Sequence, residues 1–229
     1  ALSILFGNLV GLAQRDVKRM LAYSGIAQMA YAAIGLATFN GAALEGLLVF
    51  LAGYLITNAA AFLAVAALSN GEREPHLLAD LAGLGRRNPL PATVLTLAMI
   101  SLAGVPPTVG FIGKLLVFKA AVEANLVGLA IIGVLGSLIS VGYYLRVVYM
   151  LWMKEPSREV NTPAEDVMSG AAYFLTSAGM LVLGVVPGPL LELARAHFLR
   201  TGVIVTSSLT DATPASFLAH RDSRKQQEE

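Results

Sequence analysis

The sequence Ser101-Leu-Ala-Gly-Val-Pro-Pro-Thr-Val-Gly-Phe-Ile-Gly-Lys114 places a lysine directly after a cluster of residues that interrupt helices. It lies inside an apolar stretch that extends from about Leu90 to Leu126. An ammonium group at the centre of a membrane-spanning helix costs roughly 2.5–3.5 kcal/mol on insertion scales. The helix-breaking residues before the lysine are Gly104, Pro106, Pro107, Gly110 and Gly113. A broken membrane helix beside an ionisable group is typical of an ion or proton path.

The composition of the chain is that of an integral membrane protein. Of its 229 residues, 56% are hydrophobic and only 14% are charged, whereas soluble domains contain about 25% charged residues. The net charge of +1 and the absence of basic clusters interleaved with aromatic residues give no indication of nucleic-acid binding. The sequence contains no cysteine, which excludes disulfides, iron–sulfur ligation and thiolate zinc sites within it.

The hydropathy pattern predicts an all-α, polytopic transmembrane helix bundle. Its six apolar segments are Ala1–Ala13, Met20–Phe39, Leu44–Leu68, Leu90–Ala124, Leu126–Met153 and Met168–Val186. The second, third, fifth and sixth segments each suit one membrane crossing. As a straight helix the fourth would rise about 50 Å, so we expect it to break at Pro106 and Pro107. The first segment rises only about 18 Å, so we expect the chain to begin inside a helix, with more spans upstream.

The remaining organisation follows from polarity and charge. We expect a transmembrane domain over residues 1–189, an interfacial segment over 190–205 and a disordered polar tail over 206–229. Basic residues recur in the links after the first, third and fifth segments: Arg15, Lys18 and Arg19; Arg73, Arg86 and Arg87; Lys154 and Arg158. The positive-inside rule places these three links in the cytoplasm and the C-terminus outside.

Lys114 is the predicted proton carrier. Burial disfavours the ammonium relative to the neutral amine, which allows a buried lysine to load and release a proton near neutral pH. The alternative is a lysine that extends to the membrane interface. The break supports the first interpretation, because Pro106 and Pro107 leave nearby carbonyls without backbone partners that water could satisfy. A simple packing kink is the alternative for the break itself.

Three segments carry polar side chains at helical spacing. They are Ser24, Gln28 and Tyr31 in the second segment, Tyr54, Thr57 and Asn58 in the third, and Ser137, Ser140 and Tyr144 in the fifth. Each set falls on one helical face. These groups could line a hydrated proton path between helices. For any single residue, an interhelical hydrogen bond worth about 0.6 kcal/mol is the favoured alternative.

Other charged residues receive more ordinary interpretations. Lys119 and Glu123 are four residues apart and form a predicted local ion pair near the outer end, with a proton exit as the alternative. Arg146 is expected to extend to the cytoplasmic interface, and Glu45 to lie at the other interface. The sequences Gly133-x-x-x-Ser137 and Gly136-x-x-x-Ser140 predict close helix packing.

No cofactor or metal site is predicted within these residues. The histidines, which are His76, His197 and His220, have no metal-ligand spacing. The glycines form no nucleotide-binding fingerprint, and nothing indicates binding of NADH, flavin or iron–sulfur clusters.

Several motifs occur in the order found in a known family. They are Ile4–Ser24, Leu81–Pro89, Ser101–Lys114, Tyr143–Val147 and Gly184–Pro189. In this order they resemble the antiporter-like membrane subunits of respiratory complex I, the bacterial NADH–quinone oxidoreductase, and one subunit type in particular. The resemblance covers about Ile4 to Leu191. It implies that the chain holds the second of two inverted five-helix repeats plus the final helix, without the first repeat. It also implies that Lys114 matches the lysine of the second broken helix.

The resemblance implies a membrane subunit of the bacterial inner membrane that takes part in proton translocation coupled to quinone reduction. NADH, FMN, iron–sulfur clusters and quinone would then be held by partner subunits, and the partners of this chain would be other membrane subunits and the lipid bilayer. Members of the family often carry His near the position of Gln28, which cannot itself take up a proton. The alternatives are a subunit of a multisubunit cation/proton antiporter or membrane-bound hydrogenase, and a non-transporting scaffold.

Overall fold

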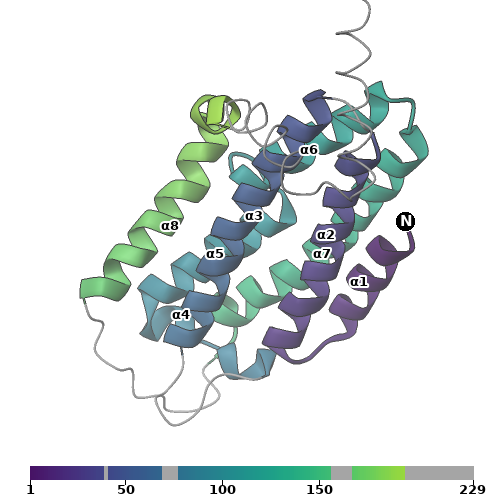
Figure 1. The fold of residues 1–229 in the computed structure, drawn as a ribbon. Helices are drawn as coiled ribbons and strands as arrows, with labels where there is room; N and C mark the ends of the chain where they lie inside the picture. The colour runs from purple at the N-terminus through teal and green to yellow at the C-terminus, as the bar shows by residue number, and fades with distance from the viewer. Residues whose placement is uncertain (39–40, 69–76, 156–166, 194–229) are drawn as a thin grey trace, which may run out of the picture.

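The structure is a computed structural model that describes residues 1–38, 41–68, 77–155 and 167–193. Within these ranges the regular elements are helical, which confirms the predicted all-α bundle (Figure 1). The helices are α1 (Leu2–Ala13), α2 (Val17–Ala37), α3 (Gly41–Ala67), the 3-10 helix η1 (Leu78–Leu81), α4 (Leu84–Arg87), α5 (Pro89–Ala103), α6 (Val109–Glu123), α7 (Val127–Met153) and α8 (Val167–Val185).

The fourth apolar segment forms two helices rather than one, as predicted. Helix α5 ends at Ala103, where Gly104 adopts a left-handed conformation with φ 85°. Helix α6 begins at Val109, after Thr108 in an extended conformation. Each half contains 15 residues. The interruption leaves the C-terminus of α5 and the N-terminus of α6 inside the bundle.

Glycines allow the broken helix to approach its neighbours closely. A Cβ atom added at Gly53 of α3 would lie 2.8 Å from Val109, and one added at Gly113 of α6 would lie 2.8 Å from the backbone of Phe50. Figure 1 shows α3 running beside both halves of the broken helix. Helix α8 reaches the break itself, because a Cβ at Gly184 would lie 2.2 Å from the carbonyl oxygen of Pro107.

The predicted packing role of two glycines of α7 is confirmed. A Cβ at Gly133 would lie 2.5 Å from the ring of Phe118, and one at Gly136 would lie 2.3 Å from Ile4. Helix α7 therefore packs closely against both α6 and α1.

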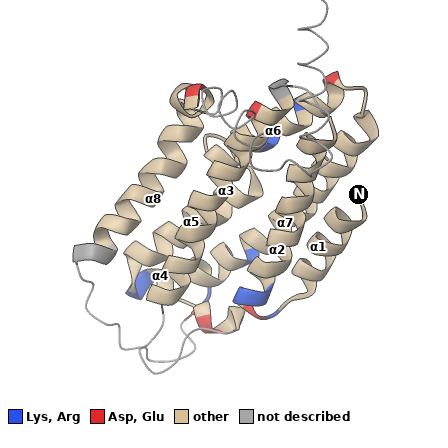
Figure 2. Ribbon diagram, in the orientation of Figure 1, with Lys and Arg blue, Asp and Glu red and all other residues tan. Residues whose placement is uncertain are grey.

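The basic links that the structure describes lie at one end of the bundle. Asp16 caps α2 by accepting a hydrogen bond of 2.8 Å from the backbone of Arg19. The amide of Leu78 donates to the carbonyl of Arg15 at 2.8 Å, and Gly83 donates to Met150 at 3.1 Å. These bonds bring together the link after α1, the end of the link after α3 and the end of α7. Figure 2 shows lysine and arginine residues at this end.

Three of the described helices are long and apolar enough to cross a membrane: Val17–Ala37, Ala43–Ala67 and Val127–Met153. The sixth segment, which we expected to suit one crossing, forms α8, a helix of 19 residues. The expected interfacial segment begins in a described helical stretch, residues 188–193, but the rest of it and the polar tail lie outside the described residues. The same holds for Arg73, Arg158 and the histidines His76, His197 and His220.

Candidate functional site around Lys114

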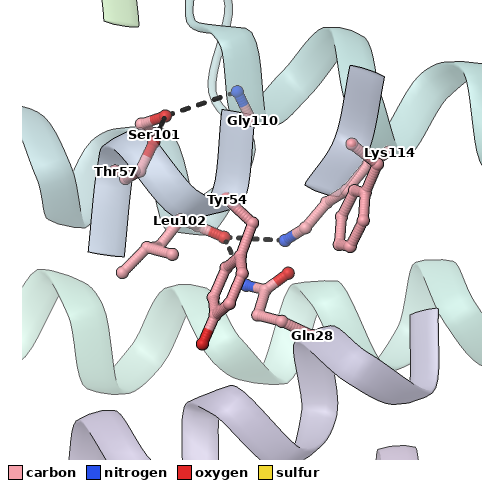
Figure 3. Close-up of a pocket in the computed structure, with 8 residues that line it drawn as sticks. Gln28, Tyr54, Thr57, Ser101, Leu102, Gly110 and Lys114 are labelled. Atoms are coloured by element: carbon pink, nitrogen blue, oxygen red, sulfur yellow. Dashed lines mark hydrogen bonds between the residues drawn. The ribbon is translucent and has the colours of Figure 1, made fainter. Parts of the chain in front are cut away.

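Lys114 lies in the second turn of α6 and points back towards the break. Its side chain is only 4% exposed. The ammonium nitrogen Nζ donates to the carbonyl oxygen of Leu102 at 2.7 Å (Figure 3). It also donates to the carbonyl oxygen of Ala103 at 3.4 Å and to the hydroxyl of Ser137 at 2.8 Å. The three protons of the ammonium thus have three uncharged partners.

The two carbonyl groups are available because α5 stops at the break. The last four carbonyls of a helix have no partner within it, and the C-terminus carries a partial negative charge. Leu102 and Ala103 belong to this last turn. A cation near such a terminus gains about 0.3–1 kcal/mol, and about 2 kcal/mol in favourable partly buried sites. The break therefore creates the surroundings that accept the lysine.

Polar side chains of α2 and α7 extend the network from the same carbonyl. Gln28 donates through Nε2 to the oxygen of Leu102 and to the hydroxyl of Tyr144, both at 3.2 Å. The Tyr144 hydroxyl also forms a short hydrogen bond with Ser24. Through Gln28 and Tyr144, Lys114 is connected to Ser24, which lies one helical turn before Gln28, towards the basic end of α2.

A second group lies on the other side of Lys114. The ammonium nitrogen is 5.1 Å from the ring centroid of Tyr31. Asn8 of α1 donates to the Tyr31 hydroxyl at 2.9 Å and accepts from the Tyr143 hydroxyl at 3.0 Å. All three of these side chains are buried.

A small cavity adjoins the lysine at the break (Figure 3). Its volume is about 10 Å³, which is room for about one water molecule. It is lined by Gln28, Phe50, Tyr54, Thr57, Ser101, Leu102, Gly110 and Lys114. The hydroxyls of Thr57 and Ser101 lie 3.1 Å apart, and Ser101 accepts from the amide of Gly110 at 3.3 Å. Ser101 thus connects the two halves of the broken helix.

The structure brings most of the predicted path residues together. Ser24, Gln28, Tyr31 and Tyr144 belong to the two groups around Lys114, and Tyr54 lines the cavity. Ser140 is one step removed, because its hydroxyl donates to the carbonyl of Ser137.

Other predicted residues lie apart from the lysine. Asn58 is half-buried and is not among the residues that line the cavity. Lys119 and Glu123 form an exposed pair at 3.7 Å with side chains 66% and 52% exposed, as the i, i+4 spacing predicted. In the break, Pro106 and Pro107 are exposed, whereas Gly110 and Gly113 pack inside. Arg146 donates to the carbonyl of Gln14 at the end of α1.

The sequence-based interpretation missed several members of the network. Asn8, Tyr143 and Ser101 were not assigned, and Ser137 was not placed next to the lysine. Asn8 had a detectable signal, because it is the single amide side chain in the mostly apolar sequence LSILFGNLVGLA. The role of the Leu102 carbonyl left no signal in the sequence, since every residue has a backbone carbonyl.

The described residues contain no group of three or more His, Cys, Asp or Glu that could hold a metal ion. The arrangement consists of one amine, several hydroxyls, two amide side chains and free carbonyls. Groups of this kind can exchange and relay protons.

Comparison with known proteins identifies the family. The family described as NADH:quinone oxidoreductase/Mrp antiporter, transmembrane, matches residues 1–140, which is more than half of the chain. The chain belongs to this family. The alkaline phosphatase family also matches residues 185–229, but most of that stretch lies outside the described residues and it is too short a part of the chain to assign a family.

Relatives in the NADH:quinone oxidoreductase/Mrp antiporter family confirm the subunit type that the motifs indicated. NADH-quinone oxidoreductase subunit N 1 of Rhizobium meliloti (strain 1021) is 41% identical over 198 residues, which cover 85% of this chain and 40% of the relative. The chain therefore spans about two fifths of the length of the curated relatives it matches. These relatives identify a multi-pass protein of the bacterial inner membrane.

Solved structures agree with this assignment. A chain of respiratory complex I from Thermus thermophilus with bound aureothin is 36% identical, with a TM-score of 0.71 over 83% of this chain and 43% of that one. A chain of the Mrp complex from Dietzia sp. DQ12-45-1b is 24% identical with a TM-score of 0.75 over 84% of this chain and 44% of that one, which shows the shared fold.

Proposed function

We propose that this chain is part of a membrane subunit of NADH–quinone oxidoreductase that takes part in proton translocation coupled to quinone reduction. Lys114 is its protonatable residue. One observation carries the proposal: a lysine only 4% exposed donates to two carbonyl groups at a helix break. NADH, FMN, iron–sulfur clusters and quinone belong to partner subunits, and other membrane subunits are the partners of this chain.

The mechanism uses the groups that contact Lys114. Protons reach the lysine from the basic, cytoplasmic end through the hydroxyls of Ser24 and Tyr144, and one water molecule, for which the cavity has room, completes the connection. Gln28 contributes by orienting the Tyr144 hydroxyl, since an amide does not titrate. Redox events in partner subunits change the charges near Lys114, and the lysine then releases its proton.

The release side of the path is the less continuous one. Ser137 accepts from Lys114, and Ser140 donates to the Ser137 carbonyl. Tyr31, Tyr54 and Asn58 are further candidates for the path inside the membrane. Lys119 and Glu123 lie further along the same helix as Lys114, towards its exposed end, and are the candidates for the exit.

The test is Lys114→Met in the full-length protein, assembled in its complex and reconstituted in vesicles. Methionine keeps a similar length but cannot carry a proton. We expect fewer protons translocated per NADH oxidised, with the assembled complex present at normal amounts. Lys154→Met, which changes an exposed lysine at the end of α7, is the matched control and should leave proton translocation intact. An unchanged proton yield in Lys114→Met would refute the role of Lys114.

The second candidate function is a subunit of a multisubunit cation/proton antiporter. It is favoured by the Mrp antiporter in the description of the family and by the likeness to the Mrp complex. Purification of the complex decides between the two. NADH-dependent quinone reduction supports the oxidoreductase, whereas sodium/proton exchange without any response to NADH supports the antiporter. A membrane-bound hydrogenase would instead reduce protons to hydrogen.

A further inference from the structure

Asn8 occupies the centre of a junction between α1, α2 and α7. Its side chain is fully buried, with 0% exposure. Its amide nitrogen donates to the carbonyl of Ile4 at 2.8 Å and to the hydroxyl of Tyr31 at 2.9 Å. Its oxygen accepts from the hydroxyl of Tyr143 at 3.0 Å. One residue on a short helix therefore fixes a tyrosine on each of two neighbouring helices.

The orientation of the Asn8 amide follows from its partners. The carbonyl of Ile4 can only accept, so it must face the nitrogen of the amide. The second proton of that nitrogen is then directed to Tyr31, and the oxygen is left to face Tyr143. An unpaired buried polar group costs about 1–3 kcal/mol, which favours this fully paired arrangement.

Gly136 of α7 provides the space for this junction. A Cβ atom added there would lie 2.3 Å from Ile4, 3.0 Å from the amide nitrogen of Asn8 and 3.0 Å from the hydroxyl of Tyr31. A side chain at residue 136 would therefore intrude on the bond between Asn8 and Tyr31.

The bond to Asn8 anchors the hydroxyl end of the Tyr31 ring. The ring centroid is 5.1 Å from the ammonium nitrogen of Lys114. The ring of Phe118 packs against Tyr31 edge to face, with centroids 5.9 Å apart. Tyr31 is thus held at its hydroxyl by Asn8 and braced by Phe118, with Lys114 near its ring.

We propose that Asn8 is a positioning residue that acts on Lys114 through the ring of Tyr31. An aromatic face attracts a cation but has no comparable attraction for a neutral amine. A ring held in place therefore stabilises the ammonium relative to the neutral amine of Lys114. A ring that moves freely provides less of this stabilisation. This inference rests on the proposed function, because it concerns the residue that carries the proton.

The first test measures the ring directly and does not depend on proton translocation. 3-Fluorotyrosine is placed at position 31 of the full-length protein in its complex, and fluorine NMR follows the flipping of the ring. We expect slow flipping with Asn8 present and roughly tenfold faster flipping in Asn8→Leu, as expected for the loss of one hydrogen bond. Thr96→Val is the matched control, because it removes a 2.8 Å bond between α5 and α7 that involves Trp152. It should leave the ring unchanged.

The second test is a double-mutant cycle on protons translocated per NADH oxidised. Asn8→Leu removes the anchor, and Tyr31→Phe removes only the hydroxyl that the anchor holds. If Asn8 acts through Tyr31, each change lowers the proton yield by the same factor, and the double variant lowers it no further. Should Asn8→Leu fail to assemble, Tyr31→Phe keeps the test open, since it loses one oxygen and retains the ring. A Tyr31→Phe variant with an unchanged proton yield would overturn the proposal.

The remaining outcomes separate this inference from the proposed function. Losses that multiply in the double variant would overturn the action through Tyr31. A faster ring in Asn8→Leu with an unchanged proton yield would also overturn it, while leaving Lys114 as the proton carrier. An unchanged proton yield in Lys114→Met would instead remove the proposed function and leave the effect of Asn8 on the ring as a separate finding.

Discussion

Lys114 has partners that a helix cannot supply to one of its own side chains. Backbone carbonyls inside a continuous helix are already paired, so a lysine in lipid would find no acceptor. Here Leu102 and Ala103 offer carbonyls from a different helix, and Ser137 offers a hydroxyl from a third. At the scale of the residue, the site is therefore an amine with acceptors from two neighbouring helices.

Gly110 is the residue where this arrangement is least tolerant of change. A Cβ added there would lie 1.9 Å from the carbonyl oxygen of Ser101. We expect Gly110→Ala to destabilise the protein by about 1–3 kcal/mol or more, because the two halves of the broken helix would be forced apart. The measurement is thermal unfolding of the protein in detergent.

The matched control for this change is Gly128→Ala. Gly110 and Gly128 are each the second residue of their helix, but nothing lies within 4 Å of a Cβ added at Gly128. We expect no loss of stability in Gly128→Ala. Equal melting temperatures for the two variants would contradict the close contact between Gly110 and Ser101.

At the scale of the element, the end of α5 depends on Gly104. This residue has φ 85°, where a residue with a Cβ is disfavoured by roughly 1–2 kcal/mol. A Cβ would also lie 3.1 Å from Cδ of Lys114. We therefore expect Gly104→Ala to lower both the stability of the protein and its proton yield. Unfolding in detergent and proton translocation in vesicles measure the two effects, and a variant that matches the wild type in both would count against this role of Gly104.

The elements were largely predictable from the sequence. The apolar segments, the break at Pro106 and Pro107 and the polar stripe on α2 all follow from local patterns that repeat with the helical period. The hydrogen-bond partners that side chains find on other helices were not predictable in this way. Tyr143 and Tyr144 are adjacent, and periodicity placed only Tyr144 on the polar face. In the bundle α7 contacts both α1 and α2, so both tyrosines find polar partners, Asn8 and Ser24.

The same limit applies to Leu102 and Asn8. A backbone carbonyl leaves no signature in a sequence, and a single asparagine has no period. The lengths and faces of helices are local properties, whereas the rotation of one helix against another depends on the whole bundle. That is why Lys114 could be singled out from the sequence, whereas the carbonyls that accept its hydrogen bonds could not.

At the scale of the whole molecule, the two ends of the bundle differ in charge. Arg15 and Arg86 are exposed at the end that holds the basic links, whereas Lys119 and Glu123 are exposed at the outer end of α6. The positive-inside rule predicts that the basic end faces the cytoplasm.

Cysteine labelling tests this orientation, since the sequence contains no cysteine of its own. We expect Arg15→Cys and Arg86→Cys to react with an impermeant maleimide in inside-out vesicles, and Glu123→Cys to react in right-side-out vesicles. Labelling of Arg15→Cys and Glu123→Cys from the same side would contradict the predicted orientation.

The carbonyl of Leu102 has a consequence for movement of the lysine. A carbonyl oxygen has two lone pairs, and here one meets the amine of Lys114 while the other meets the amide of Gln28. When the amine swings away, the amide remains, so the oxygen is never stranded in an apolar interior at a penalty of about 1–3 kcal/mol. The amine of Lys114 can therefore move away from the Leu102 carbonyl and return to it, because Gln28 continues to donate a hydrogen bond to that oxygen.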